Sequence, residues 1–209
     1  MAKKVKEYRI HDQPVEDISV LEPEATYSYA DYLKWSFEER VELIKGKLFK
    51  MSPAPGRGHQ AINGNIHGVM WNFLRKKSCK LFAAPFDVRF PQKIDSTNRE
   101  TFTVVQPDIC VICDPEKLDD AGCKGAPDLI VEILSPSTSK KDLNDKFYLY
   151  EEFKVKEYWV VYPGDKVLEI FYLEQGKYSR SKKYLPGDLV ISEVLSGLSL
   201  NVNDIFEGT

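Results

Sequence analysis

The stretch Ala126–Thr138, APDLIVEILSPST, reads as a buried β-strand that carries two acids. An apolar run bounded by proline-containing turns is typical of a strand in the core of a sheet. Asp128 and Glu132 are four positions apart, so on a strand both project from the same face. A buried carboxylate without a partner is costly or becomes protonated. The stretch therefore predicts a core strand with a polar site on one face.

The flanking sequence predicts helices and strands that build one sheet around this strand. Apolar residues at helical spacing indicate helices at 27–40, 59–77 and 142–153, and apolar runs indicate strands at 81–90, 102–112 and 155–163. A hairpin over 41–51 and a β-meander after 165 complete the pattern. We expect an α/β fold with a mixed central sheet flanked by helices and a β-rich C-terminal extension. Residues 1–26 are expected to form a flexible tail and residues 27–209 a single domain.

Composition excludes some classes of protein. The net charge of −3 and the pI near 5.7 argue against constitutive nucleic-acid binding, so any such surface is local or acts with a bound cation. No run approaches the roughly 20 apolar residues of a membrane span, and the N-terminus lacks the apolar core of a secretory signal. Cys110 and Cys113 would face opposite sides of a strand, so buried reduced thiols are expected, with a zinc site as the alternative. These features predict a cytoplasmic protein without membrane partners.

A second acid in an apolar run, Asp108 in VVQPDICVI, gives Glu132 a possible partner. If the two strands are neighbours in matching register, the carboxylates approach within a few ångströms. Two like charges at that distance are destabilising unless a divalent cation lies between them, and hard oxygen ligands suit Mg²⁺ or Mn²⁺. The alternative is a separate salt bridge or strand-end cap for each acid.

Several longer stretches carry a family resemblance. They are VELIKGKLFKMSP, the histidine at 59, VVQPDICVICDPEKL, GAPDLIVEILSPSTSKKDLNDKFYLYEEFKVKEYWVVYP and SGLSLNVNDIF. Over residues 27–207 the chain resembles the Uma-two family of restriction-endonuclease-like proteins, in the PD-(D/E)xK nuclease superfamily. The resemblance implies a metal-dependent phosphodiester hydrolase with DNA as substrate and Mg²⁺, or alternatively Mn²⁺, as cofactor.

The same resemblance implies the ligands of the cation. Asp108, Glu132 and the backbone carbonyl of Ile133 would hold it, and it would lower the pKa of the attacking water. The superfamily places a lysine two residues after the second acid, where this chain has Leu134.

We interpret Lys146, on the following helix, as the lysine that has moved into this role. It flanks the buried helix face. The alternative is an ordinary surface lysine paired with Asp142 four positions earlier.

Four further residues are candidates for the site. Glu42 lies in the VELIKG segment and could complete the acid set, or could instead pair across the hairpin with Lys50. His59 opens the long helix and could contact a phosphate, act as a general base or cap the helix. Asp128 and Asp87 are expected to support the site from outside, although Asp128 could also be a strand-start cap.

Three functions fit these features. The leading one is a Mg²⁺-dependent DNA endonuclease, acting as a homodimer because a two-fold pair readily cuts both strands of a duplex. Leu134 favours a second, a catalytically inactive nuclease fold that binds nucleic acid or regulates. The third is an interaction protein, in which the acids have only a structural role.

Overall fold

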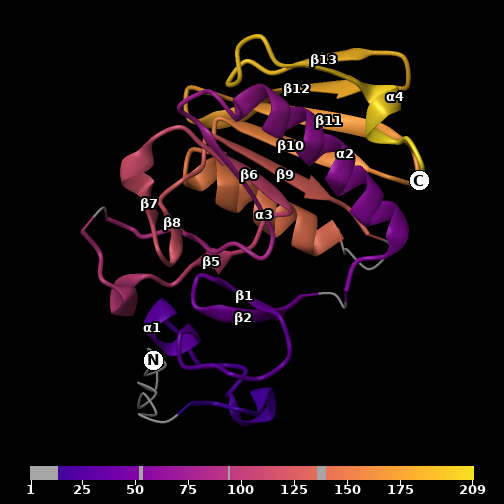
Figure 1. Ribbon diagram of the computed structural model, residues 1–209. Helices are drawn as coiled ribbons and strands as arrows, with labels where there is room; N and C mark the ends of the chain where they lie inside the picture. The colour runs from indigo at the N-terminus through magenta and orange to yellow at the C-terminus, as the bar shows by residue number, and fades with distance from the viewer. Residues whose placement is uncertain (1–13, 52–53, 94, 136–139) are drawn as a thin grey trace. The chain divides into compact units, whose positions relative to one another are not determined.

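The computed structural model describes residues 14–51, 54–93, 95–135 and 140–209 (Figure 1). The chain forms two compact units, one made of Met1–Pro53 with Arg89–Val105 and the other of Ala54–Val88 with Gln106–Thr209. Of the tail predicted over residues 1–26, the first thirteen residues lie outside the described part. None of the helices in the described ranges combines the length and apolar character needed to cross a bilayer.

The first unit is built around a β-hairpin. Strands β1 (Val41–Ile44) and β2 (Lys47–Lys50) pair antiparallel, as expected from the sequence. Lys45 and Gly46 form the turn, with positive φ angles of 51° and 77°. Glycine adopts such an angle without steric cost, which suits Gly46 to its position. Strand β5 (Val104–Val105) pairs with β1, and the unit also holds the short helices η1 (Ile18–Val20), α1 (Tyr29–Tyr32) and η2 (Asn98–Glu100).

The helix expected over 27–40 is wrong in its length, because α1 ends at Tyr32. The helix begins near the expected position, at Tyr29, where Ser28 and Asp31 form a capping box. Beyond α1, Trp35 forms a parallel bridge with Val15 and packs against Tyr32 at 5.6 Å. Tertiary packing thus overrides the helical spacing. Trp35 packs against a buried hydrophobic cluster, to which some residues expected in the tail also contribute side chains: Val15, Leu21 and Ala25.

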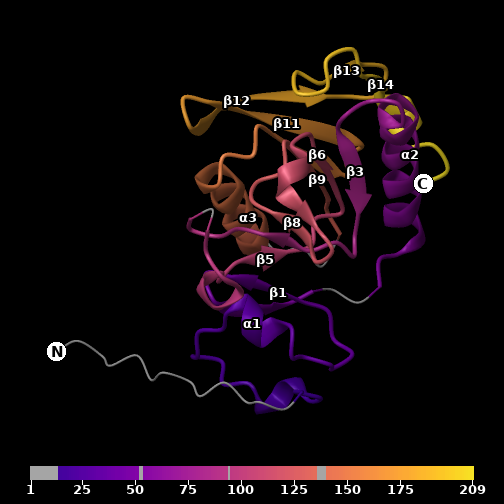
Figure 2. The same ribbon diagram turned by 60° about the vertical axis from the view of Figure 1, so that its left-hand side comes forward.

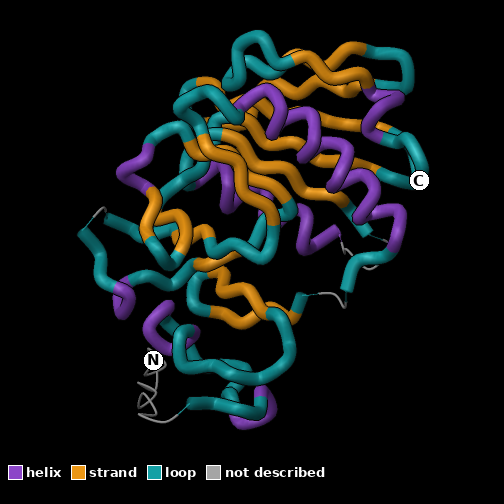
Figure 3. Tube along the Cα trace, in the orientation of Figure 1, coloured by secondary structure: helices purple, strands orange, loops and turns teal. Residues whose placement is uncertain are grey.

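The second unit contains the predicted mixed sheet, whose strands are drawn in orange in Figure 3. Its strand order is β12-β11-β10-β9-β6-β3. Strands β9 and β10 pair in parallel, whereas the other neighbours pair antiparallel. The strands are β3 (Lys80–Ala83), β6 (Ile109–Ile112), β9 (Leu129–Ile133), β10 (Glu157–Tyr162), β11 (Val167–Glu174) and β12 (Lys177–Tyr184).

Two long helices cover opposite faces of this sheet, which confirms the flanked mixed sheet (Figures 1 and 2). Helix α2 (Arg57–Leu74) lies on the face formed by the odd-numbered residues of β9 and β10. Helix α3 (Lys140–Glu152) lies on the other face, where Tyr150 and Phe147 contact Tyr158 and Phe171. Helix α3 provides the crossover between the parallel strands β9 and β10. Strand alternation therefore directs Glu132 toward α3.

Two of the predicted strands are each split in two. The strand expected over 81–90 becomes β3 and β4 (Val88–Arg89), and that over 102–112 becomes β5 and β6. Pro85 and Pro107 lie in the gaps, and proline cannot donate to a sheet ladder. The remaining elements are η3 (Pro115–Lys117), β7 (Leu118–Asp119), β8 (Gly122–Lys124), β13 (Leu189–Ile191), β14 (Ser199–Asn201) and α4 (Val202–Ile205).

The cysteines correct an expectation. Cys79 and Cys113 form a disulfide, one position beyond the last paired residues of the antiparallel strands β3 and β6. Cys110 and Cys123 are free and buried, and burial raises the pKa of the Cys110 thiol. The expectation of reduced thiols fails for Cys113 because the register brings Cys79 opposite to it. The cytoplasmic location stays a prediction, but a reduced Cys113 no longer supports it.

Helix α3 is tied to β12 by Glu151, which should make stability sensitive to acid. Its carboxylate accepts hydrogen bonds from Lys177 Nζ at 2.8 Å and from the Tyr178 backbone N–H at 2.7 Å. The Lys177 bond and then the Tyr178 bond lower the pKa of Glu151 below its usual 4.5. A lowered folded-state pKa stabilises the fold above the unfolded-state pKa, and this contribution is lost as pH falls through the folded-state value.

Replacing Glu151 with glutamine should therefore lower the free energy of unfolding near neutral pH and flatten its fall below pH 4.5. Urea titrations from pH 3 to 7 would measure this, with the exposed neighbour Glu152→Gln as control. Identical pH profiles for Glu151→Gln and the wild type would contradict the expectation.

Candidate functional site

Asp108 and Glu132 meet across two adjacent strands. The antiparallel register pairs Ile109 with Val131, so one position further on Asp108 comes opposite Glu132. The bond from the Ile133 backbone N–H to Asp108 Oδ2, at 2.7 Å, ties the Asp108 side chain to the end of β9. The sequence predicts that the two acids lie close together if the strands are neighbours in matching register. The structure has this register.

Helix α2 contributes two side chains to Asp108. His59 Nε2 lies 3.3 Å from Asp108 Oδ2, and Asn63 Nδ2 donates to the Asp108 carbonyl at 3.4 Å. Burial lowers the pKa of His59, but Asp108, helped by the Ile133 backbone and Glu132, raises it by more, so the net value lies above 6.5. The imidazole is thereby biased toward its cationic form beside the acid. Its Nδ1 is buried without a hydrogen-bond partner among the described residues.

Helix α3 contributes two donors to Glu132. Lys146 Nζ lies 2.9 Å and the Tyr150 hydroxyl 2.6 Å from the same oxygen, Glu132 Oε1. Residues four apart share a helix face, which explains why both reach one carboxylate. The side chains of Lys146 and Glu132 are 16% and 11% exposed, so this ion pair is largely shielded from water.

The position two residues after Glu132 holds no amine, because it is a leucine, Leu134. Leu134 follows the strand, and its backbone N–H donates to the Val161 carbonyl at 3.0 Å. The structure brings Lys146 to Glu132 instead, as the sequence hypothesis required. The alternative partner of Lys146, Asp142, has a side chain outside the described residues.

Three other residues predicted for the site make contacts with residues other than Asp108 and Glu132. Glu42 is a buried residue of β1 in the first unit, where it pairs across the hairpin with Phe49, and Lys50 instead lies 3.9 Å from Glu39. Asp87 accepts a hydrogen bond from Gln106 Nε2 at 2.9 Å.

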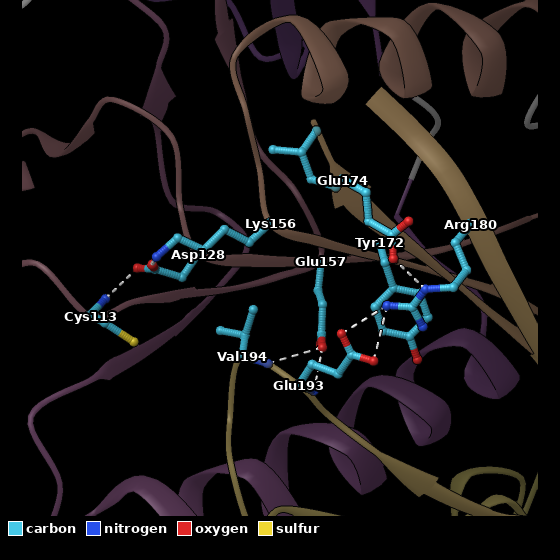
Figure 4. Close-up of a pocket in the computed structure, with 10 residues that line it drawn as sticks. Cys113, Asp128, Lys156, Glu157, Tyr172, Glu174, Arg180, Glu193 and Val194 are labelled. Atoms are coloured by element: carbon cyan, nitrogen blue, oxygen red, sulfur yellow. Dashed lines mark hydrogen bonds and ion pairs between the residues drawn. The ribbon is translucent and has the colours of Figure 1, made fainter. Parts of the chain in front are cut away.

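Asp128 lies at the opposite end of β9 from Glu132, in a pocket of about 510 Å³ (Figure 4). There it accepts bonds from Lys156 Nζ at 2.6 Å and from the Cys113 backbone N–H at 2.8 Å. Its surroundings fit the strand-start cap, one of the two readings of the sequence.

Sequence reasoning did not assign a site role to Tyr150 or Asn63. Tyr150 falls on the apolar face of its helix, a position that by itself indicates a core residue. Its distance of four residues from Lys146 was a usable signal, since a buried tyrosine hydroxyl needs a polar partner. Asn63 carried no comparable signal.

The donor set can be tested against a metal ion. Within the described ranges no three His, Cys, Asp or Glu side chains converge as a metal-binding group. Mg²⁺ is commonly bound by one or two carboxylates, with water and substrate phosphate completing its shell. Asp108 and Glu132 on facing strands fit that requirement, and Asp108 Oδ1 has no hydrogen-bond partner among the described residues.

Comparisons with known proteins agree with this architecture. The model of the Uma2 family, described as "Putative restriction endonuclease", matches residues 29–203. An uncharacterized protein of Synechocystis sp. is 30% identical over 122 residues, which are 57% of this chain and 60% of that protein's length. A crystal structure from Anabaena variabilis, described as a putative nuclease belonging to DUF820, matches with a TM-score of 0.66 at 20% identity, covering 86% of this chain and 97% of that one. That likeness confirms the expected restriction-endonuclease-like fold.

Proposed function

This chain belongs to the Uma2 family of restriction-endonuclease-like proteins, and on that premise we propose that it is a metal-dependent endonuclease that hydrolyses phosphodiester bonds in DNA. The observation that carries the proposal is the meeting of Asp108 and Glu132 across β6 and β9, with the Lys146 amine 2.9 Å from Glu132. Two acids and a lysine at one sheet end match the group of residues that such hydrolysis requires.

The proposed cofactor is Mg²⁺, with Mn²⁺ as the alternative. Asp108, Glu132 and the Ile133 carbonyl are the proposed ligands. When bound, such a cation polarises a phosphoryl oxygen and lowers the pKa of a bound water.

The protein's own side chains have separate roles in the proposal. Lys146 carries a positive charge that would stabilise the negative charge developing on the phosphate. His59 and the Ile133 N–H hold Oδ2 of Asp108, which leaves Oδ1 for the cation. Low exposure of Lys146 and Glu132 strengthens these electrostatic interactions by excluding water.

The proposed partners are a DNA duplex and a second copy of the chain. With a net charge of −3, attraction to DNA must come from a local surface and should weaken steeply with salt. Homodimerisation would place two sites on the two strands of a duplex. We place the activity in the cytoplasm.

One observation favours a second function, a nucleic-acid-binding or regulatory module without catalysis. Leu134 occupies the usual lysine position, and Lys146 is held in an ion pair with Glu132. If that pair persists when DNA binds, the amine does not reach a phosphate. Salt-sensitive DNA affinity without Mg²⁺-dependent turnover would support this module.

The test compares Lys146→Met with Lys156→Met in a plasmid cleavage assay with Mg²⁺ or with EDTA. Lys146→Met keeps most of the length of the side chain and removes its charge, and should slow cleavage by about a hundredfold. Lys156 pairs with Asp128 and has a side chain 65% exposed, so Lys156→Met should cleave within about twofold of the wild type. Wild-type protein that leaves the plasmid intact, or cleavage unaffected by EDTA, would rule out the proposed activity.

A further inference from the structure

Tyr150 forms a short, buried bond to the candidate site, through a hydroxyl that donates to Glu132 Oε1 at 2.6 Å. The tyrosine is fully buried, whereas Lys146, which bonds the same oxygen, is partly exposed. A hydroxyl that donates to a carboxylate forms a strong, directional bond. Of the two groups that bond Glu132 Oε1, Tyr150 is therefore the better shielded from water.

The ring of Tyr150 is itself held in place. It packs edge-on against Tyr158 of β10, with ring centroids 5.0 Å apart and an interplanar angle of 71°. Tyr158 is fully buried, and its hydroxyl has no hydrogen-bond partner among the described residues. Tyr158 thus supports the ring of its neighbour by packing, and Tyr150 alone of this pair directs its hydroxyl to Glu132.

The two donors have a consequence for Glu132. Because both bonds end on Oε1, they restrain the orientation of the Glu132 carboxylate. Groups that bond a metal ligand from behind fix its orientation, and their loss usually lowers metal affinity or activity by about 10- to 100-fold.

We propose that Tyr150 is a positioning residue that holds the Glu132 carboxylate in the orientation in which it binds the divalent cation. The inference rests on the proposed function for its cation, but it concerns cation affinity and not DNA cleavage. The Tyr150 hydroxyl keeps Glu132 in its binding orientation even when Lys146 moves toward a phosphate.

The experiment pairs Tyr150→Phe with Tyr158→Phe, two buried neighbours that each lose one hydroxyl. Calorimetric titration with Mn²⁺ should show affinity lowered by about 10- to 100-fold in Tyr150→Phe and unchanged in Tyr158→Phe. Thermal unfolding checks that both variants are folded. In the cleavage assay, raising the Mg²⁺ concentration should restore the rate of Tyr150→Phe but not that of Glu132→Gln.

The outcomes separate this inference from the proposed function. Equal Mn²⁺ affinity in Tyr150→Phe and wild type overturns the positioning role even if DNA is cleaved. Weakened affinity in Tyr150→Phe alone supports it even if the wild type does not cleave DNA. No Mn²⁺ binding by the wild type overturns the role, because Glu132 then has no cation to face.

Discussion

Glu132→Gln is expected to lower the rate of Mg²⁺-dependent DNA cleavage by about 10³-fold while leaving the protein folded. Glutamine keeps the shape of glutamate, and its amide oxygen can still accept bonds from Lys146 and Tyr150. What it loses is the negative charge that would hold the cation. Single-turnover cleavage of a labelled duplex measures the rate, and chemical denaturation measures the stability.

The chain offers a matched control for Glu132 on the same sheet. Val160 pairs with Glu132 on one side and with Glu169 on the other, so both acids stand in one cross-strand row. Glu169 is also buried, and it bonds Ser181 at 3.1 Å. Glu169→Gln should cleave at nearly the wild-type rate. A Glu132→Gln variant that cleaves as fast as Glu169→Gln would refute a catalytic role for Glu132.

The largest effect on stability is expected at Glu157, a fully buried acid at the start of β10. Its carboxylate accepts hydrogen bonds from Trp159 Nε1 at 3.0 Å, from Ser192 Oγ at 2.8 Å and from the backbone N–H groups of Glu193 and Val194. Glu157→Ala would leave these donors buried without an acceptor. The free energy of unfolding should fall by about 3–5 kcal/mol.

Denaturant unfolding at pH 7 would measure the effect of Glu157→Ala. The control is Glu193→Ala, which removes an acid 59% exposed that pairs with Arg180 and should cost less than about 1 kcal/mol. A Glu157→Ala variant as stable as Glu193→Ala would mean that water replaces the lost acceptor. Because Glu157 lies at the end of β10 away from Val160, DNA cleavage per folded molecule should not change.

Local patterns in the sequence predicted much of the second unit. The apolar residues Ile62, Ile66 and Met70 recur at helical spacing, and α2 buries them against the sheet. The run around Glu132 became β9, and in the first unit the hairpin over 41–51 formed as expected. These features depend on residues close together in the chain, so their periodicity and turn chemistry were sufficient.

Features that depend on distant residues could not be predicted in the same way. The helix expected over 27–40 was cut short by the bridge between Trp35 and Val15, and Cys113 found Cys79 only through the register of β3 and β6. Glu157 gave no sign in the sequence of its role, because three of its four donors lie 35 or more positions away, in Ser192, Glu193 and Val194. Such pairings depend on how the sheet closes, and no local pattern encodes that.

The candidate site likewise combines features that the local sequence indicates with features that only the tertiary structure decides. Local chemistry was enough to select Asp108 and Glu132, because acids in apolar strands are visible in the sequence. Lys146 was selected because the family resemblance calls for a lysine and this one flanks a buried helix face. Their meeting required the antiparallel register of β6 and β9 and the packing of α3 on the sheet. The bond from Tyr150 to Glu132 arose from the same packing, since a hydroxyl on a buried face takes whichever acceptor the tertiary structure brings within reach.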